Sequence, residues 1–309
     1  MDNDSCSGCL RIIMRIPPFI PFGGHEIQTS SPNRADAVIL PLCYERSPSY
    51  GSGTGKAPYH ILVASAQMEL MDEETLFNWG SLNIHTLYPY EPCDDPPAAI
   101  KEISRIAGKV LKAGKFLLSL GGDHAISIGT IGAVAEHAPD VGVIQIDAHL
   151  DFRDEWNGSR YNHACVMRRV VDDFKLPVVQ VGIRSFSEEE ASIIKERGYA
   201  PFYAHLLHPF DNRWMEEVLS RLPERVYLTL DVDGLDPSVI PGTGTPEPGG
   251  LMYRQVVGLI KLLGRKKQVV GADICELVKI EGSYISEFTA ARLAQKILVY
   301  CVGGISKND

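Results

Sequence analysis

The fold is decided by residues 115–151, which read KFLLSLGGDHAISIGTIGAVAEHAPDVGVIQIDAHLD. The apolar runs at 115–120 and 141–146 are typical of buried strands, and residues 126–137 between them carry apolar side chains at helical spacing. Two strands joined through a helix run parallel, because only antiparallel neighbours can be joined by a short turn. This stretch therefore predicts one strand-helix-strand crossover of a parallel sheet.

The same alternation continues on both sides of this stretch. Further buried strands are expected at 37–42, 177–183, 225–230 and 268–274, and further helices at 98–113, 187–197, 251–264 and 288–301. A parallel sheet needs helices on both faces. We therefore predict an α/β protein with three αβα layers and a doubly wound, mostly parallel sheet.

Composition and length bound the organisation of the chain. Its 309 residues are 45% hydrophobic and 22% charged, as in ordinary globular proteins. We see no internal repeat and no long Gly/Ser linker, so we expect an N-terminal extension over 1–30 and a single domain over 31–309.

The charge balance argues against a nucleic-acid binder. The 30 Lys and Arg residues face 39 Asp and Glu, a net charge of −9, whereas phosphate binding needs clustered cations. No window approaches the roughly 18 apolar residues of a membrane helix. We expect a cytoplasmic protein that binds neither nucleic acid nor membrane.

Cysteine usage points to reduced thiols, because seven is an odd number in a long chain. Cys6 and Cys9 have zinc-like spacing, but no second close pair accompanies them. A frayed N-terminus is favoured over a metal or redox role for this pair.

Acidic and imidazole side chains follow three of the expected strands. The motifs are Gly121-Gly122-Asp123-His124, Asp147-Ala148-His149-Leu150-Asp151 and Asp231-Val232-Asp233-Gly234. Parallel sheets bind ligands beyond the carboxyl ends of their strands, so these motifs should meet at one edge. Side chains alternate in an extended chain, which is expected to place Asp147, His149 and Asp151 on one side.

Converging carboxylates would repel one another unless cations bind between them. Two His and four Asp side chains form an oxygen-rich set that suits Mn²⁺ and also admits Fe²⁺, Ni²⁺ or Zn²⁺. Six ligands exceed what one ion with an open position needs, so two ions per chain fit better. Taken singly, each Asp is better explained as a cap or turn residue; the conjunction favours a dinuclear site.

These motifs, with the run from Asp231 through Pro241-Gly242-Thr243-Gly244-Thr245-Pro246-Glu247-Pro248-Gly249-Gly250, resemble the ureohydrolase family of arginases and agmatinases, agmatinases most closely. The resemblance covers roughly residues 35–303 and implies an arginase-like fold for a single catalytic domain. It also implies a metal-bridging hydroxide as nucleophile, with Asp147 and Asp231 bridging the ions. The implied Mn²⁺ ligands are His124, Asp147, His149, Asp151, Asp231 and Asp233.

Two further roles follow from the resemblance, and the mechanism suggests a third. His163 matches the family's proton-shuttling histidine, suited to protonating the departing amine. Glu276 matches the glutamate that pairs with the guanidinium, whose planar N–H fork fits a carboxylate. Asp151 could also accept a hydrogen bond from the hydroxide and aim it. Ala125 and the pair Ala164-Cys165 depart from the common family pattern but remove no metal ligand.

The segment 152–160 lacks the polar pattern by which arginases hold the amino-acid end of arginine, and it carries acids instead. Asp154, Glu155 or Glu247 could attract a terminal ammonium, with a solvated loop as the equal alternative. We therefore expect hydrolysis of agmatine to putrescine and urea. N1-aminopropylagmatine, arginine and guanidinobutyrate are the alternative substrates.

Other interpretations receive less support. A catalytically silent family member acting as a binding or regulatory subunit would have lost a ligand, and a phosphoesterase would need a cation cluster. Gly51-Ser52-Gly53-Thr54-Gly55-Lys56 lacks two positions of a phosphate-binding loop; in the family, a Gly-rich loop here lies near the active-site mouth. Resemblance alone implies a homo-oligomer, a trimer or hexamer.

Overall fold

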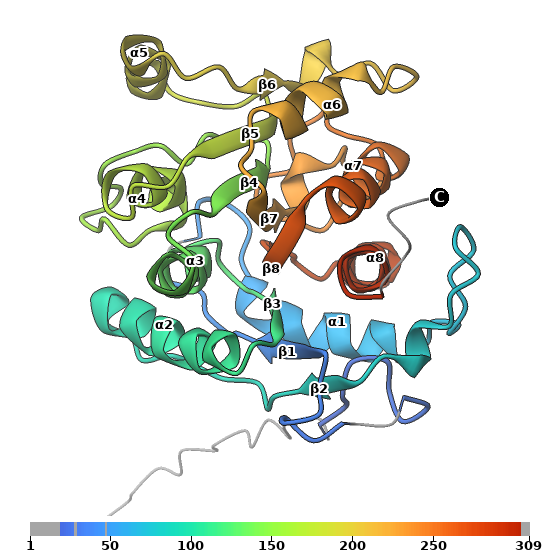
Figure 1. Cartoon of the computed structure of the whole chain (residues 1–309). Coiled ribbons are helices and arrows are strands. Elements are labelled where there is room, and N and C mark those ends of the chain that lie inside the picture. Colours follow the sequence, from blue (N-terminus) through green and yellow to red (C-terminus); the bar gives the residue numbers. More distant parts are fainter. Residues whose placement is uncertain (1–18, 28–29, 47, 304–309) are drawn as a thin grey trace, which may run out of the picture.

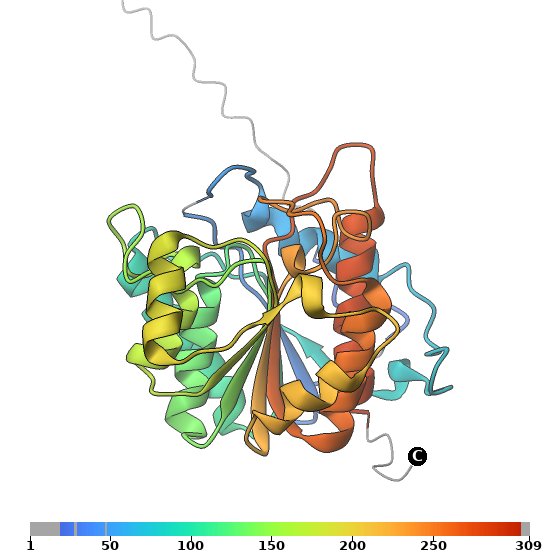
Figure 2. The same cartoon turned by 90° about the horizontal axis from the view of Figure 1, so that it is seen from above.

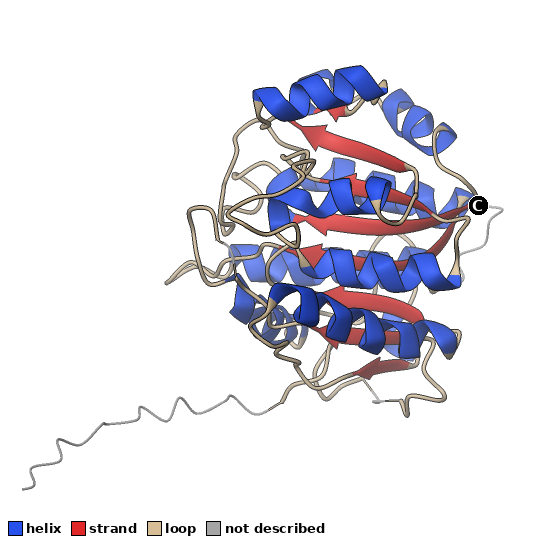
Figure 3. Cartoon of the chain, turned by 90° about the vertical axis from the view of Figure 1, so that its left-hand side faces the viewer, coloured by secondary structure: helices blue, strands red, loops and turns tan. Residues whose placement is uncertain are grey.

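One sheet of eight strands forms the centre of the protein, whose computed structural model describes residues 19–27, 30–46 and 48–303. The strand order is β2-β1-β3-β8-β7-β4-β5-β6, every neighbouring pair is parallel, and all arrows point the same way in Figure 3. The strands are β1 Ala37–Pro41, β2 Ile84–Thr86, β3 Phe116–Leu120, β4 Gly142–Ile146, β5 Val178–Ile183, β6 Phe202–Tyr203, β7 Arg225–Asp231 and β8 Gln268–Cys275.

Helices cover both faces of the sheet, which confirms the predicted three-layer α/β architecture. In Figure 1, α2, α3, α4 and α5 lie on one face and α1, α6, α7 and α8 on the other, and Figure 2 shows the twisted sheet between them. Each face has its own cluster of buried apolar side chains. The helices are α1 Ala57–Ser65, α2 Pro96–Lys112, α3 Ile126–His137, α4 Val166–Asp172, α5 Glu188–Arg197, α6 Arg213–Ser220, α7 Tyr253–Lys266 and α8 Ile285–Cys301.

Local sequence signals explain why two of the helices begin where they do. The Asp95 side chain accepts a hydrogen bond from Ala98 N at 3.2 Å, and Pro96 opens α2. The helix α5 starts with a reciprocal capping box between Ser187 and Glu190 and ends at Gly198, whose φ of 70° suits glycine. The predicted helices, placed from apolar residues at helical spacing, lie within a few residues of their observed ends.

The N-terminal part of the described chain contributes to the core. Phe22 and Ile27 are buried, and the Phe22 ring lies 5.9 Å from the ring of Trp79. Cys6 and Cys9 lie outside the described residues, and the five described cysteines are free. Over the described ranges, no helix has the length and apolar character needed to cross a bilayer.

Candidate metal centre

The predicted ligands gather at the carboxyl ends of three strands. His124 follows β3, Asp147 follows β4 and Asp231 ends β7. The strands β4 and β7 are neighbours, and only β8 separates β7 from β3. Figure 3 shows loops collected at this end of the sheet, so residues far apart in the sequence meet there.

Of the six ligands, Asp231 is the last residue of β7 and the others lie beyond the strand ends, so the predicted alternation of Asp147, His149 and Asp151 along an extended chain is wrong in detail. The strand β4 ends at Ile146, and the carboxylate of Asp147 then accepts a hydrogen bond from His149 N at 2.6 Å. Asp231 accepts from Asp233 N at 2.9 Å in the same way. These are turns in which an aspartate side chain binds the backbone two residues on. The turns, and a φ of 50° at Asp151, aim the side chains inward.

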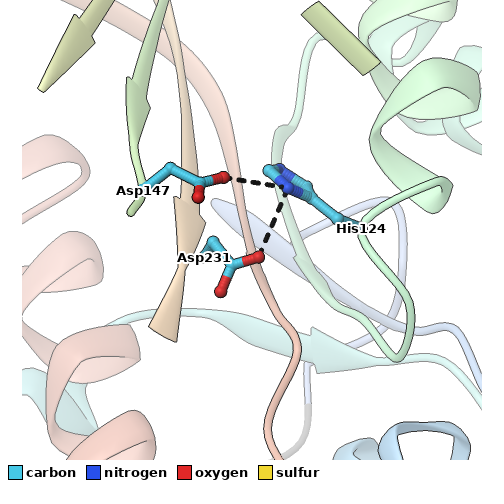
Figure 4. Close-up of side chains that lie close together, drawn as sticks. All are labelled: His124, Asp147 and Asp231. Carbon is cyan, nitrogen blue, oxygen red and sulfur yellow. Dashed lines mark ion pairs between the residues drawn. The ribbon is translucent and has the colours of Figure 1, made fainter. Parts of the chain in front are cut away.

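Two clusters of ligand atoms result, and they share one residue. His124, Asp147 and Asp231 form one group and Asp147, His149 and Asp233 the other, each with its ligand atoms within 4.8 Å of one another. Figure 4 shows the His124 ring facing the carboxylates of both Asp147 and Asp231. The shared Asp147 is therefore the carboxylate best placed to bridge two ions.

Asp151 completes the set of six. Its Oδ2 lies 2.9 Å from Nδ1 of His124, while Oδ2 of Asp233 lies 3.0 Å from Nδ1 of His149. Asp147, Asp151, Asp231 and Asp233 are all buried. The structure thus brings together every residue that the sequence proposed as a metal ligand.

A test of whether these residues fit a cation comes from the tautomer of His124. Its Nε2 lies 2.8 Å from Oγ1 of Thr229, whose own hydroxyl proton goes to Asp273 at 2.7 Å. Thr229 must therefore accept a proton from Nε2, so the lone pair of the neutral ring is on Nδ1. Among the described residues, Nδ1 is buried without a hydrogen-bond partner, although carboxylate oxygens lie 2.9–3.4 Å away. A lone pair facing carboxylates is stable only with a cation between them, so the residues fit a metal ion.

Asp273 anchors this arrangement from inside the sheet. It is completely buried, and its carboxylate accepts hydrogen bonds from Tyr227, Thr229, Ser127 and Thr130 at 2.7–3.2 Å. Hydroxyl donors on both oxygens stabilise the buried charge. The network therefore holds the hydroxyl of Thr229 in place for His124.

The electrostatics of the cluster also favour bound cations. Burial together with Asp233 raises the pKa of Asp231 well above its ordinary value, and burial together with Asp147 raises the pKa of Asp151 to about 7. Burial opposes protonation of His124, yet the surrounding carboxylates raise its pKa well above the usual value. The buried aspartates thus favour bound protons at a position where divalent ions would neutralise the same negative charge.

A close backbone approach lets the strand ends meet. A Cβ on Gly234, just after β7, would lie 2.7 Å from Asp147 N. Only glycine avoids this clash, so Gly234 permits the two ligand-bearing loops to touch.

His163 and Glu276 lie beside the ligands. A narrow cavity of about 30 Å³ is lined by both residues together with His124, Asp151 and Asp231. Glu276 has a φ of 65° and accepts a hydrogen bond from His124 N at 2.6 Å. Burial, with Asp123 nearby, raises the pKa of its carboxyl group, and a cation entering the cavity would lower that pKa again by favouring the ionised form.

Asp154 and Glu247 occupy other positions. Asp154 is exposed and pairs with Arg169 and, at 3.5 Å, with Arg160. The backbone oxygen of Glu247 accepts from Arg184 at 2.7 Å. Neither Asp154 nor Glu247 is among the described residues that line the two cavities beside the ligands.

Sequence reasoning missed three residues that the structure places at or behind the site: Thr229, Asp273 and Ser49. Thr229 stands two positions before Asp231 on the same strand, so strand periodicity could have placed it on the same side. Asp273 is a charged residue in an otherwise apolar strand, a signal that also went unused. No sequence signal connects Ser49 to His163, which lies 114 positions away.

A parallel sheet with paired ligand clusters at its carboxyl edge defines the class of metal-dependent α/β hydrolases. Residues 35–300 match the arginase family, and the chain belongs to this family, close to the agmatinases. It is accordingly a hydrolase of linear amidines, and the predicted arginase-like fold is confirmed.

Three relatives give the scale of the similarity. The N(1)-aminopropylagmatine ureohydrolase of Synechocystis is 38% identical, covering 86% of this chain and 89% of its own. The agmatinase of Pyrococcus horikoshii is 31% identical, covering 90% and 95%. The crystal structure of the agmatine ureohydrolase of Thermoplasma volcanium has a TM-score of 0.84 at 29% identity, covering 93% and 95%.

Proposed function

We propose that the protein hydrolyses N1-aminopropylagmatine to urea and spermidine, and agmatine to urea and putrescine less efficiently. The sequence alone favoured agmatine, with N1-aminopropylagmatine as an alternative. The alternative has better support, because a relative named for that activity is 38% identical, against 31% for an agmatinase. We infer Mn²⁺ as the metal, two ions per chain, from the oxygen-rich donor set.

The shape of the site carries this proposal. The narrow cavity beside the ligands adjoins a wider one of about 300 Å³, with which it shares Ser49, His149, Asp151, His163 and Thr245. A guanidinium fits the narrow part against Glu276, and the amine chain then extends into the wide part. That part has room for the three carbons and the nitrogen by which N1-aminopropylagmatine exceeds agmatine.

The residues divide the chemistry between them. The six ligands would hold two divalent ions, which would supply activated water for attack on a guanidinium carbon. Glu276 binds the guanidinium and orients its carbon toward the ligand cluster. Burial lowers the pKa of His163, so its ring is neutral at pH 7 and can pass a proton to the departing amine after accepting one.

Phe186 lines only the wide cavity and is 41% exposed, so an ammonium group on the chain can lie against its ring. Phe186→Ala should raise KM for N1-aminopropylagmatine more than for agmatine, because the shorter substrate reaches this ring less. Phe210→Ala is the matched control, since Phe210 is 92% exposed and lines neither cavity.

The deciding experiment is a parallel assay of the Mn²⁺-loaded protein with N1-aminopropylagmatine, agmatine, arginine and guanidinobutyrate. Urea and the amine product are measured for each. We expect the highest kcat/KM with N1-aminopropylagmatine. A higher value with arginine or guanidinobutyrate would overturn the proposed substrate class, and absence of urea from all four would overturn the proposed activity.

A further inference from the structure

The side chain of His163 is hydrogen-bonded to a residue from a distant loop. Oγ of Ser49 lies 2.8 Å from Nε2 of His163, although 114 positions separate the two residues. We propose that Ser49 is a positioning residue, which holds the His163 ring in the orientation required for proton exchange with the substrate. This inference rests on the proposed function of the site.

The loop that carries Ser49 is fixed at both of its sides. The carboxylate of Glu45 accepts hydrogen bonds from Gly53 N at 2.8 Å and from Gly55 N at 2.9 Å. Gly51 N donates to Gly244 O at 3.0 Å. A Cβ on Gly51 would lie 3.0 Å from Gly244 Cα, so the two loops touch through their backbones. Ser49 is therefore presented by an anchored loop.

The backbone of His163 is fixed as well, but its ring is not fixed by the backbone. Asn162 is buried, and its side chain accepts a hydrogen bond from Ala164 N at 3.0 Å at the start of the short helix η3, His163–Cys165. The torsion that turns a histidine ring has a broad energy minimum. A hydrogen bond to a ring nitrogen is thus the means of setting the ring plane, and Ser49 supplies one.

Both residues lie where the reaction would take place. Ser49 and His163 line the narrow and the wide cavity alike. With the guanidinium in the narrow part and the chain in the wide part, the nitrogen that leaves is at the junction. A serine hydroxyl can donate to a neutral ring nitrogen or accept from a protonated one. The bond can therefore hold the ring before and after proton transfer.

The kinetic test compares two serines of one loop. Ser49→Ala should lower kcat roughly 3- to 10-fold, the effect of losing one hydrogen bond, with KM and metal content unchanged. Ser49→Thr keeps the hydroxyl and should retain most of the rate. Ser52→Ala is the matched control, because Ser52 is exposed and lines neither cavity. Equal kcat for Ser49→Ala and Ser52→Ala would overturn the inference.

A double-mutant cycle separates positioning from general loop stability. If Ser49 acts through His163, Ser49→Ala should have no further effect on kcat in a His163→Asn background. A loss of the same size in both backgrounds would show that Ser49 acts independently of His163.

An NMR measurement tests the hydrogen bond without relying on activity. In Zn²⁺-loaded protein with ¹⁵N-labelled histidine, the ring signals missing from His163→Asn identify His163. Ser49→Ala should shift those signals and Ser52→Ala should not. Unchanged signals would overturn the inference even in an active enzyme, whereas shifted signals without urea release would overturn only the proposed function.

Discussion

His149 and His163, which both line the wide cavity, differ in the groups that face their rings. We therefore expect different roles for the two residues. Nδ1 of His149 faces Asp233 at 3.0 Å, whereas Nε2 of His163 faces a serine hydroxyl. His149→Ala should therefore reduce bound Mn²⁺ and urea release together. His163→Ala should keep the metal and slow turnover by roughly 10²- to 10⁴-fold, the usual contribution of an acid-base group.

Metal analysis by mass spectrometry, run beside the urea assay, decides between these assignments. Equal metal loss in both variants would contradict them, because His163 would then behave as a ligand. Glu276→Gln is a useful third variant, since it should retain the metal and bind the guanidinium weakly.

Thr229 offers a second test at the scale of single residues. Its hydroxyl fixes which nitrogen of His124 carries the proton, so Thr229→Val should weaken the binding of Mn²⁺ at the His124 cluster by roughly 10- to 100-fold. Titration of metal-free protein by calorimetry measures this directly. Thr229→Ser should bind almost as the wild type does. Tyr227→Phe removes a different hydrogen bond to Asp273, and a loss of the same size there would contradict a specific role for Thr229.

At the scale of elements, a buried ion pair ties the segment before β2 to α8. The side chains of Lys296 on α8 and Asp72 are 1% and 0% exposed, and Glu73 adds a contact to Lys296 at 3.0 Å. Lys296→Met should lower the free energy of unfolding by about 3–5 kcal/mol, because Asp72 stays buried without its cation. The double variant with Asp72→Asn should recover part of this loss in denaturant titrations.

The pH dependence of this effect has a definite sign. Burial alone would raise the pKa of Asp72, but hydrogen bonds from Lys296 and Thr75 lower it below the ordinary value of 3.8. The pair thus stabilises the wild type above that pH, and the contribution is lost as the pH falls through the lowered pKa. In Lys296→Met the hydrogen bonds from Thr75 remain but the cation is lost, so the pKa of Asp72 should rise and the destabilisation should be larger at pH 7 than at pH 4. A pH-independent difference would contradict this account.

The sequence predicted the long, strongly patterned elements well and the short ones poorly. The helix at 126–137 was predicted with its observed bounds, because apolar periodicity continues over its whole length. β2 and β6 have only three and two residues, too few for a pattern, and α6 has eight. Tertiary packing, which a local pattern does not contain, defines such elements.

The features of the site also fall into those that the sequence could predict and those that it could not. Ligands that directly follow strands, such as Asp147, could be placed from the topology of parallel sheets. The turns that aim them could not, because they depend on hydrogen bonds such as that from His149 N to Asp147. Ser49 reaches His163 through a loop held by Glu45, and no periodicity encodes that contact.

At the scale of the whole molecule, the net charge of −9 is partly concentrated in one place. Four buried aspartates meet at the carboxyl edge of the sheet, one at the end of β7 and three in the segments that follow β4 and β7. Their mutual repulsion opposes folding unless cations bind. Metal binding should therefore stabilise the folded chain as well as activate it.

Chelation should consequently lower the unfolding temperature by several degrees, and Mn²⁺ should restore it. A ligand present at a hundred times its Kd stabilises the folded state by about 2.7 kcal/mol. Differential scanning calorimetry with EDTA, and then with excess Mn²⁺, measures the shift. Asp233→Asn is the control, because it removes a ligand charge from one cluster and should respond less to Mn²⁺. An equal rise in unfolding temperature in both proteins would show that the stabilising ions bind elsewhere. The metal would then not neutralise the charge of the four aspartates.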